Sequence, residues 1–171
     1  MNAIIARSWN YPAASRRLLA AVAAACGLLA AAQAADPHTE AHHTIVPADK
    51  VTWAPGPASL PAGAQLAVLL GNPAKEGPFV IRLKFPDGFV VPPHRHTKDE
   101  FLTVVSGRFG VGAGEKFDKE ATVPLAATSF VHLPAGMPHY ARADGETIVQ
   151  INGVGPFDVA YIDPKDDPRR Q

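Results

Sequence analysis

The most informative part of the chain is residues 88–107, Gly88-Phe-Val-Val-Pro-Pro-His94-Arg-His96-Thr-Lys-Asp-Glu100-Phe-Leu-Thr-Val-Val-Ser-Gly107. On a β-strand, residues two apart point to the same side, so His94 and His96 present both imidazoles to one face. The polar Thr-Lys-Asp link can turn the chain, and the next strand then begins at Glu100 with Leu102 and Val104 on its inner face. Two imidazoles and a carboxylate that converge in this way predict a site for a first-row divalent metal ion.

A second cluster, Pro134-Ala135-Gly136-Met137-Pro138-His139, supplies a fourth ligand. The prolines make a rigid turn directly before His139 and so set the direction of the strand that it begins. Three histidines and one glutamate, His94, His96, His139 and Glu100, leave one or two coordination positions for water, oxygen or a substrate atom.

Both clusters resemble the conserved motifs of the cupin superfamily. The first motif, G-x5-H-x-H-x3-E-x6-G, is matched at each fixed position, Gly88, His94, His96, Glu100 and Gly107. The second, G-x5-P-x-G-x2-H-x3-N, is matched at Pro134, Gly136 and His139 and departs at Thr128 and Ala143. The resemblance covers residues 51–162 and implies a small antiparallel β-barrel, a cupin jelly roll, with the metal inside it.

A narrower resemblance runs from Glu100 through Gly114-Glu115-Lys116-Phe117 to Ile151-Asn152-Gly153-Val154-Gly155-Pro156. This stretch is similar to the zinc-binding cupin domain of the ChrR-type anti-sigma factors. Their helical sigma-binding domain has no counterpart here, so the resemblance implies a metal-binding cupin and leaves the activity open.

The rest of the chain also favours an all-β fold. Apolar and polar residues alternate from Phe79 to Phe85, as on a half-buried strand, and Pro86-Asp87-Gly88 and Asp144-Gly145 are turn signals. No stretch keeps a helical period beyond one turn. We expect strands at 65–70, 79–85, 100–105, 128–133, 147–151 and 157–162, a pattern typical of a sandwich or barrel. The glycines at 107, 110, 112 and 114 fit a barrel corner better than a phosphate loop, because no helix follows them.

The two ends of the chain have different roles. Residues 1–34 are predicted to be a signal peptide: arginines precede the uncharged stretch 18–32, and Ala32-Gln33-Ala34 is a small-residue cleavage site. The protein is therefore expected to be exported, periplasmic or secreted, by the general or the twin-arginine route. Residues 35–50 are expected to form a flexible arm with His38, His42 and His43, and residues 163–171 a charged tail without core residues.

Charge and cysteine content exclude several classes of function. The 171 residues include 16 basic and 16 acidic side chains, and cleavage after Ala34 leaves 13 basic against the same 16 acidic ones. A net charge of about −3 argues against partners such as nucleic acid or an anionic membrane surface. Cys26, the one cysteine, lies in the predicted signal peptide, so disulfides and thiolate chemistry are excluded from the mature protein.

Two functions from different classes fit these residues. The first is a metal-dependent enzyme of dioxygenase type that acts on a small organic acid, diketone or phenolic compound, as the resemblance implies for many cupins. The second is a non-enzymatic module that binds or senses a metal. The ion can be Zn, Fe, Mn, Ni or Cu, and the sequence leaves monomer and homodimer open.

Three other polar residues lie near these motifs. We expect His132 to be a hydrogen-bonded structural histidine. Gln150 and Asn152 either orient a ligand or a histidine of the site, or have no role there.

Overall fold

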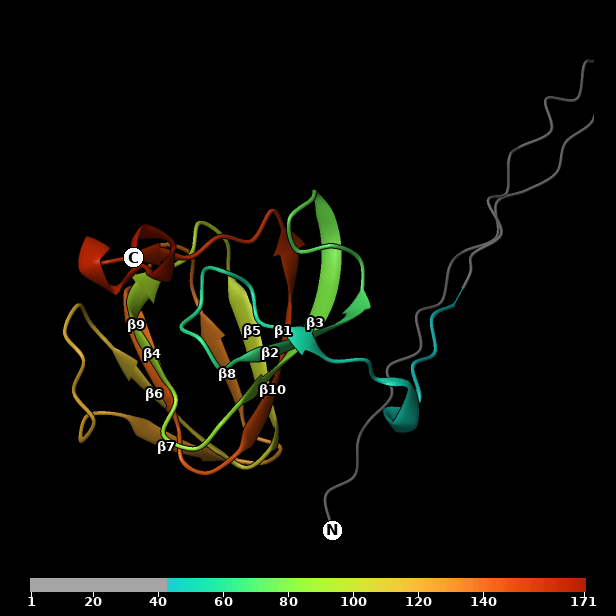
Figure 1. Ribbon diagram of the computed structural model, residues 1–171, viewed down its shortest axis with the longest axis horizontal. Coiled ribbons are helices and arrows are strands. Elements are labelled where there is room, and N and C mark those ends of the chain that lie inside the picture. The colour runs from blue at the N-terminus through green and yellow to red at the C-terminus, as the bar shows by residue number, and fades with distance from the viewer. Residues whose placement is uncertain (1–42) are drawn as a thin grey trace, which may run out of the picture. The chain divides into compact units, whose positions relative to one another are not determined.

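The computed structural model describes residues 43–171, and these residues form two antiparallel β-sheets that face each other (Figure 1). One sheet has six strands in the order β1 (Ala54–Pro55), β2 (Gln65–Leu70), β3 (Gly77–Phe85), β10 (Thr147–Gly155), β5 (Glu100–Ser106) and β8 (Phe130–Leu133). The other has five, in the order β11 (Ala160–Tyr161), β4 (Val90–Arg95), β9 (His139–Ala143), β6 (Arg108–Ala113) and β7 (Val123–Ala126). The predicted all-β fold, a small antiparallel barrel, is confirmed.

The alternation read from residues 79–85 builds the inner face of β3. Phe79, Ile81, Leu83 and Phe85 are buried, and the residues between them are half-buried on the outer face. The Phe85 ring stacks on Phe109 of β6 at a centroid distance of 5.6 Å, so these side chains join the two sheets in one core. Burial of such large apolar side chains supplies about 1.5–3 kcal/mol each.

The strands that carry the two motifs begin close to where the sequence places them. Strand β5 begins at Glu100, with Leu102 and Val104 buried, and β9 begins at His139. Strand β4 ends at Arg95, so His96 lies one residue beyond it rather than on it. The register of β4 against β9 shifts between Val91 and His94, and this irregularity is where the regular two-residue alternation ends.

Neither the predicted segments nor the two motifs include strands β6 and β7 of the second sheet. Strand β6 contains two glycines, which weaken the apolar alternation, and β7 is only four residues long with a proline inside it. The glycines fit the role expected for a barrel corner. A Cβ atom at Gly112 would lie 2.2 Å from the Tyr140 ring, so only glycine lets β6 and β9 approach this closely.

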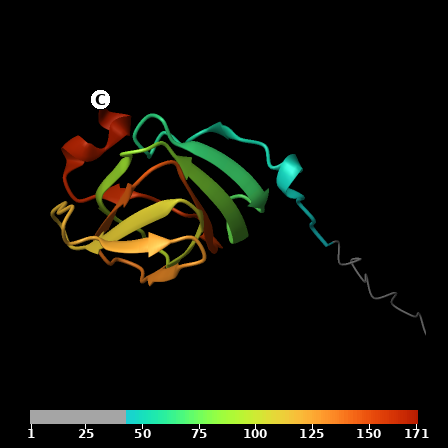
Figure 2. The same ribbon diagram turned by 90° about the horizontal axis from the view of Figure 1, so that it is seen from below.

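Residues 163–171, predicted as a charged tail without core residues, lie against the barrel. They form the short 3-10 helices η2 (Pro164–Asp166) and η3 (Pro168–Arg170), which lie at the rim of the barrel (Figure 2). Asp167 is buried and accepts hydrogen bonds from Arg169, which also donates to the Val159 carbonyl at 2.9 Å. No apolar core residue comes from this segment, but a buried carboxylate does.

The predictions for the N-terminal part fall mostly outside the described residues. The signal peptide at 1–34 and the arm histidines His38 and His42 lie there, whereas the last part of the arm is exposed and includes the 3-10 helix η1 (Ala48–Lys50). Among residues 43–171, no helix is long and apolar enough to cross a membrane.

Candidate metal centre

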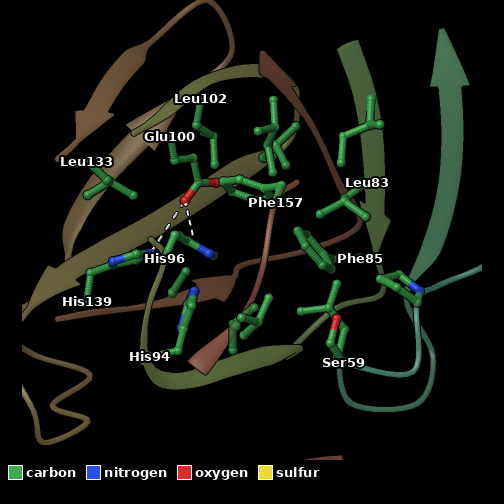
Figure 3. A pocket seen from close by; sticks show the side chains of 18 of the residues that line it. Ser59, Leu83, Phe85, His94, His96, Glu100, Leu102, Leu133, His139 and Phe157 are labelled. Atoms are coloured by element: carbon green, nitrogen blue, oxygen red, sulfur yellow. Dashed lines mark ion pairs between the residues drawn. The ribbon is translucent and has the colours of Figure 1, made fainter. Parts of the chain in front are cut away.

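Four side chains predicted to act together meet inside the barrel. His94, His96, Glu100 and His139 are each at most 5% exposed, and one ligand atom from each histidine lies within 4.8 Å of the other two. His94 is paired directly opposite His139 in the β4–β9 register, and their ring centroids are 4.2 Å apart. The Oε2 atom of Glu100 lies 3.1 Å from Nε2 of His96 and 3.4 Å from Nε2 of His139 (Figure 3).

Backbone carbonyls determine how the three imidazoles are oriented. Each ring has its Nδ1 atom at hydrogen-bond distance from a carbonyl oxygen, and a carbonyl can only accept, so Nδ1 carries the proton in all three. The pairs are His94 with Pro92 at 2.7 Å, His139 with Met137 at 3.0 Å, and His96 with Asp158. In the neutral rings the Nε2 lone pairs are therefore free, as in histidines that bind metals.

The electrostatics of the cluster also suit a cation. Burial, together with the neighbouring His139 and His96, lowers the pKa of His94 to about 3, so this ring is neutral at physiological pH. Burial alone raises the pKa of Glu100, but the histidines beside it outweigh burial and lower the pKa to about 2. The cluster thus combines a charged carboxylate with at least one neutral imidazole.

One buried nitrogen of the cluster has no hydrogen-bond partner. Nε2 of His96 is close to Glu100, but the contact does not have the angles of a hydrogen bond. A buried polar atom left unpaired costs about 1–3 kcal/mol, so native proteins rarely keep one without a reason. Three imidazole nitrogens and one carboxylate oxygen are a donor set that fits a first-row divalent ion, and coordination would satisfy this atom.

The cluster opens onto an apolar cavity of about 130 Å³ between the two sheets (Figure 3). Its walls include Leu83, Phe85, Leu102, Leu133 and Phe157. Ile81, on the same buried face of β3 as Leu83, lines this cavity as well. Among the described residues that line it, Glu100 and the three histidines of the cluster are the only titratable side chains.

A segment that the sequence analysis did not connect with the site holds His96 in place. The Phe157 ring stacks on the His96 ring at a centroid distance of 4.4 Å, and the Asp158 carbonyl accepts from His96 Nδ1. The Asp158 carboxylate in turn accepts from the amide and the hydroxyl of Thr97. About sixty residues separate this segment from His96, so no local spacing could have indicated the contact.

The turn of the second motif joins the two halves of the site. The Gly136 amide donates to the His96 carbonyl at 2.8 Å, which ties the turn before His139 to the end of the first motif. Gly136 has φ +76°, a conformation that favours glycine. Thr128 stands where the motif usually has glycine. Its φ of +74° is the conformation that favours glycine, so the backbone there is the one that the motif requires.

The remaining polar candidates lie away from the cluster. Nε2 of the exposed His132 is 3.2 Å from Asp99 Oδ2, in accord with a structural role. Gln150 accepts from Arg82 at 3.1 Å and donates to Asn152 at 3.3 Å, while Val149 and Ile151 fill the inner face. Gln150 and Asn152 therefore do not reach the site, which answers the question the sequence left open.

Comparison with known proteins identifies the fold independently. A family model described as a cupin domain matches residues 81–165, which include His94, His96, Glu100 and His139. No curated protein matches the sequence.

Several solved structures share the architecture at low sequence identity. The polyketide cyclase RemF from Streptomyces resistomycificus is similar with a TM-score of 0.60 and 16% identity, over 74% of this chain and 90% of that one. KdgF from Halomonas sp. is similar with a TM-score of 0.52 and 20% identity, over 67% of this chain and 96% of that one. An RmlC-like cupin from Shewanella frigidimarina is similar with a TM-score of 0.52 and 17% identity, over 66% of this chain and 90% of that one. At such identities the likeness shows the fold alone, and the narrower ChrR-type resemblance stays a prediction from the sequence.

Proposed function

The chain belongs to the cupin superfamily, and from this premise we propose that it is a metal-dependent enzyme of dioxygenase type that acts on a small organic molecule. In this proposal His94, His96, His139 and Glu100 hold one divalent metal ion. A metal ion in such a site can polarise a substrate oxygen and, if it is redox-active, supports oxidation by dioxygen.

The observation that carries the proposal is the apolar cavity in front of the cluster. A site that only stores or senses a metal needs four ligands and no organic cavity, whereas here an apolar space of about 130 Å³ adjoins the four side chains. Concave apolar pockets with a few convergent polar groups are the usual form of small-molecule sites. This space favours the enzyme over the metal-binding module.

The lining of the cavity narrows the class of reaction. Apart from the cluster itself, none of the described lining residues is titratable. Reactions that need a separate protein acid or base therefore fit the site poorly. The chain contributes shape, exclusion of water and a fixed set of ligands, and the substrate contributes its own oxygen donor.

An anaerobic Fe(II) titration followed by nitric oxide tests whether the site is open. We expect a high-spin iron–nitrosyl signal in electron paramagnetic resonance, because four protein ligands leave at least one exchangeable position, unlike a closed tetrahedral site. Oxygen consumption with catechols and diketones then tests turnover. Bound iron without the nitrosyl signal would contradict the enzyme and favour the metal-binding module.

A matched variant links turnover to the cavity. Ala141 lines the cavity from β9 but is not part of the cluster. In Ala141→Leu the larger side chain should fill the space while the four ligands keep their metal. We expect unchanged iron content and loss of substrate-dependent oxygen consumption. Equal consumption by this variant would show that the reaction takes place outside the cavity.

A further inference from the structure

One polar side chain lines the cavity away from the cluster. Among the described lining residues, those outside the cluster are apolar except Ser59. Figure 3 places Ser59 across the pocket from His139 and Glu100, below Phe85. Ser59 is half-buried in this lining.

The backbone of Ser59 is fixed by two hydrogen bonds. The Leu60 amide donates to Pro57 at 2.9 Å and closes the turn, and the Tyr161 hydroxyl donates to the Ser59 carbonyl at 2.7 Å. The backbone that carries the Ser59 side chain is therefore already ordered, and binding a ligand does not have to order it.

The volume and polarity of the cavity limit which ligand can lie between the cluster and Ser59. An engineered cavity of about 150 Å³ lined by similar apolar side chains binds benzene, so about 130 Å³ suits one ring or an equally compact group. No charged side chain other than those of the cluster lines the cavity in the described residues, so a charged group of the ligand outside the cluster would have no counter-ion there. The body of the ligand must be neutral and apolar.

We propose that Ser59 is a specificity-determining residue that hydrogen-bonds the end of the substrate remote from the cluster. The substrate class is then a compact molecule of about one ring, with one oxygen at the cluster and a second polar group at the opposite end. This inference rests on the proposed function, because the cluster must hold a metal ion that binds the first oxygen.

Two phenols of nearly equal size test the inference. Hydroquinone and 4-methylphenol differ at the remote end only by a hydroxyl in place of a methyl group. Each is titrated anaerobically into the Co(II)-loaded protein, and the visible cobalt spectrum reports binding. One neutral hydrogen bond is worth about fivefold in affinity, and the two equivalent hydroxyls of hydroquinone add a factor of about two. We expect wild-type protein to prefer hydroquinone about tenfold.

Variants at position 59 separate the hydrogen bond from other causes. Ser59→Ala should reduce the preference to the statistical factor of about two and leave the affinity for 4-methylphenol unchanged. Ser59→Thr keeps a hydroxyl and should keep most of the preference. The role of Ser59 is overturned if Ser59→Ala keeps the tenfold preference for hydroquinone. It is also overturned if wild-type protein binds 4-methylphenol but shows no preference for hydroquinone. In both cases the proposed function stands. Failure of both phenols to change the cobalt spectrum overturns the proposed function as well.

Discussion

His96 is the residue on which most of the local contacts of the site converge. It touches Glu100 from the first motif, stacks on Phe157, and donates to Asp158 from a third segment of the chain. Its Nε2 atom is nevertheless unpaired. The surrounding contacts therefore fix the ring and leave one nitrogen for a ligand.

Replacing His96 by Ala should abolish most metal binding. Loss of a ligand weakens the site, and the stabilisation that a metal gives to the native state is lost with it, about 4 kcal/mol at a thousandfold excess over the dissociation constant. Elemental analysis and thermal unfolding with added metal measure both effects. The control is His132→Ala, because His132 is an exposed histidine outside the cluster and its variant should keep its metal. Wild-type metal content in His96→Ala would remove this residue from the ligand set.

Thr128 is a residue whose conformation costs stability. It is a β-branched residue at φ +74°, where its side chain is strained and glycine is not. We expect Thr128→Gly to raise the free energy of unfolding by about 1 kcal/mol, as measured by urea denaturation. Ser129→Gly is the matched control at the neighbouring position, where φ is not positive, and it should destabilise the protein. Destabilisation by both substitutions would show that Thr128 is not strained.

At the scale of strands, the sequence predicted the elements with strong local patterns and missed those without. Strand β3 alternates cleanly because one face meets the core, and β5 and β9 begin at residues that motifs mark. Strands β6 and β7 carry glycine and proline in place of an apolar period. Strand β6 is placed by its pairing with β9, and β7 by its pairing with β6, rather than by an apolar period of their own.

The same reason explains which parts of the site could be predicted. His94, His96 and Glu100 lie within one short stretch, so their spacing along a strand and across the polar link that follows it predicted that they converge. Phe157 and Ser59 come from distant segments, and only the closed barrel places them on one cavity. Long-range packing of this kind leaves no periodic trace in a single sequence.

The close approach of β6 and β9 makes a prediction at this scale. Tyr140 is 1% exposed and lies over Gly112, with Phe117 against it at a centroid distance of 5.3 Å. Gly112→Ala should lower the free energy of unfolding by about 2 kcal/mol, because a Cβ atom there overlaps the ring and forces the strands apart. The exposed neighbour gives the control, Ala113→Ser, which should change stability little. An unchanged denaturation midpoint for Gly112→Ala would mean that Tyr140 moves freely.

At the scale of the whole molecule, the proposed export of the protein depends on residues 1–34. We expect the mature chain to begin at Ala35, which mass spectrometry of the exported protein can read directly. If the twin-arginine route is used, changing Arg16 and Arg17 to Lys should block export, because that route recognises the arginine pair. Normal export of this variant would point to the general secretory route. A mature chain that still begins at Met1 would contradict the signal peptide itself.

The export route affects which metal ion the protein acquires. A protein folded before export can acquire Mn or Fe in the cytoplasm, whereas Cu and Zn bind more tightly wherever the supply is not controlled. The native metal is therefore best identified in protein isolated from its own host.

Anomalous diffraction from crystals of the metal-loaded mature protein is the decisive experiment for the four-ligand metal site. Data collected on both sides of the absorption edge locate the metal without assumptions about the ligands. We predict one peak about 2.1 Å from Nε2 of His94, His96 and His139 and from a carboxylate oxygen of Glu100, with a further coordination position facing the cavity. A peak elsewhere, or no peak at these four side chains in protein that carries stoichiometric metal, would contradict this metal site.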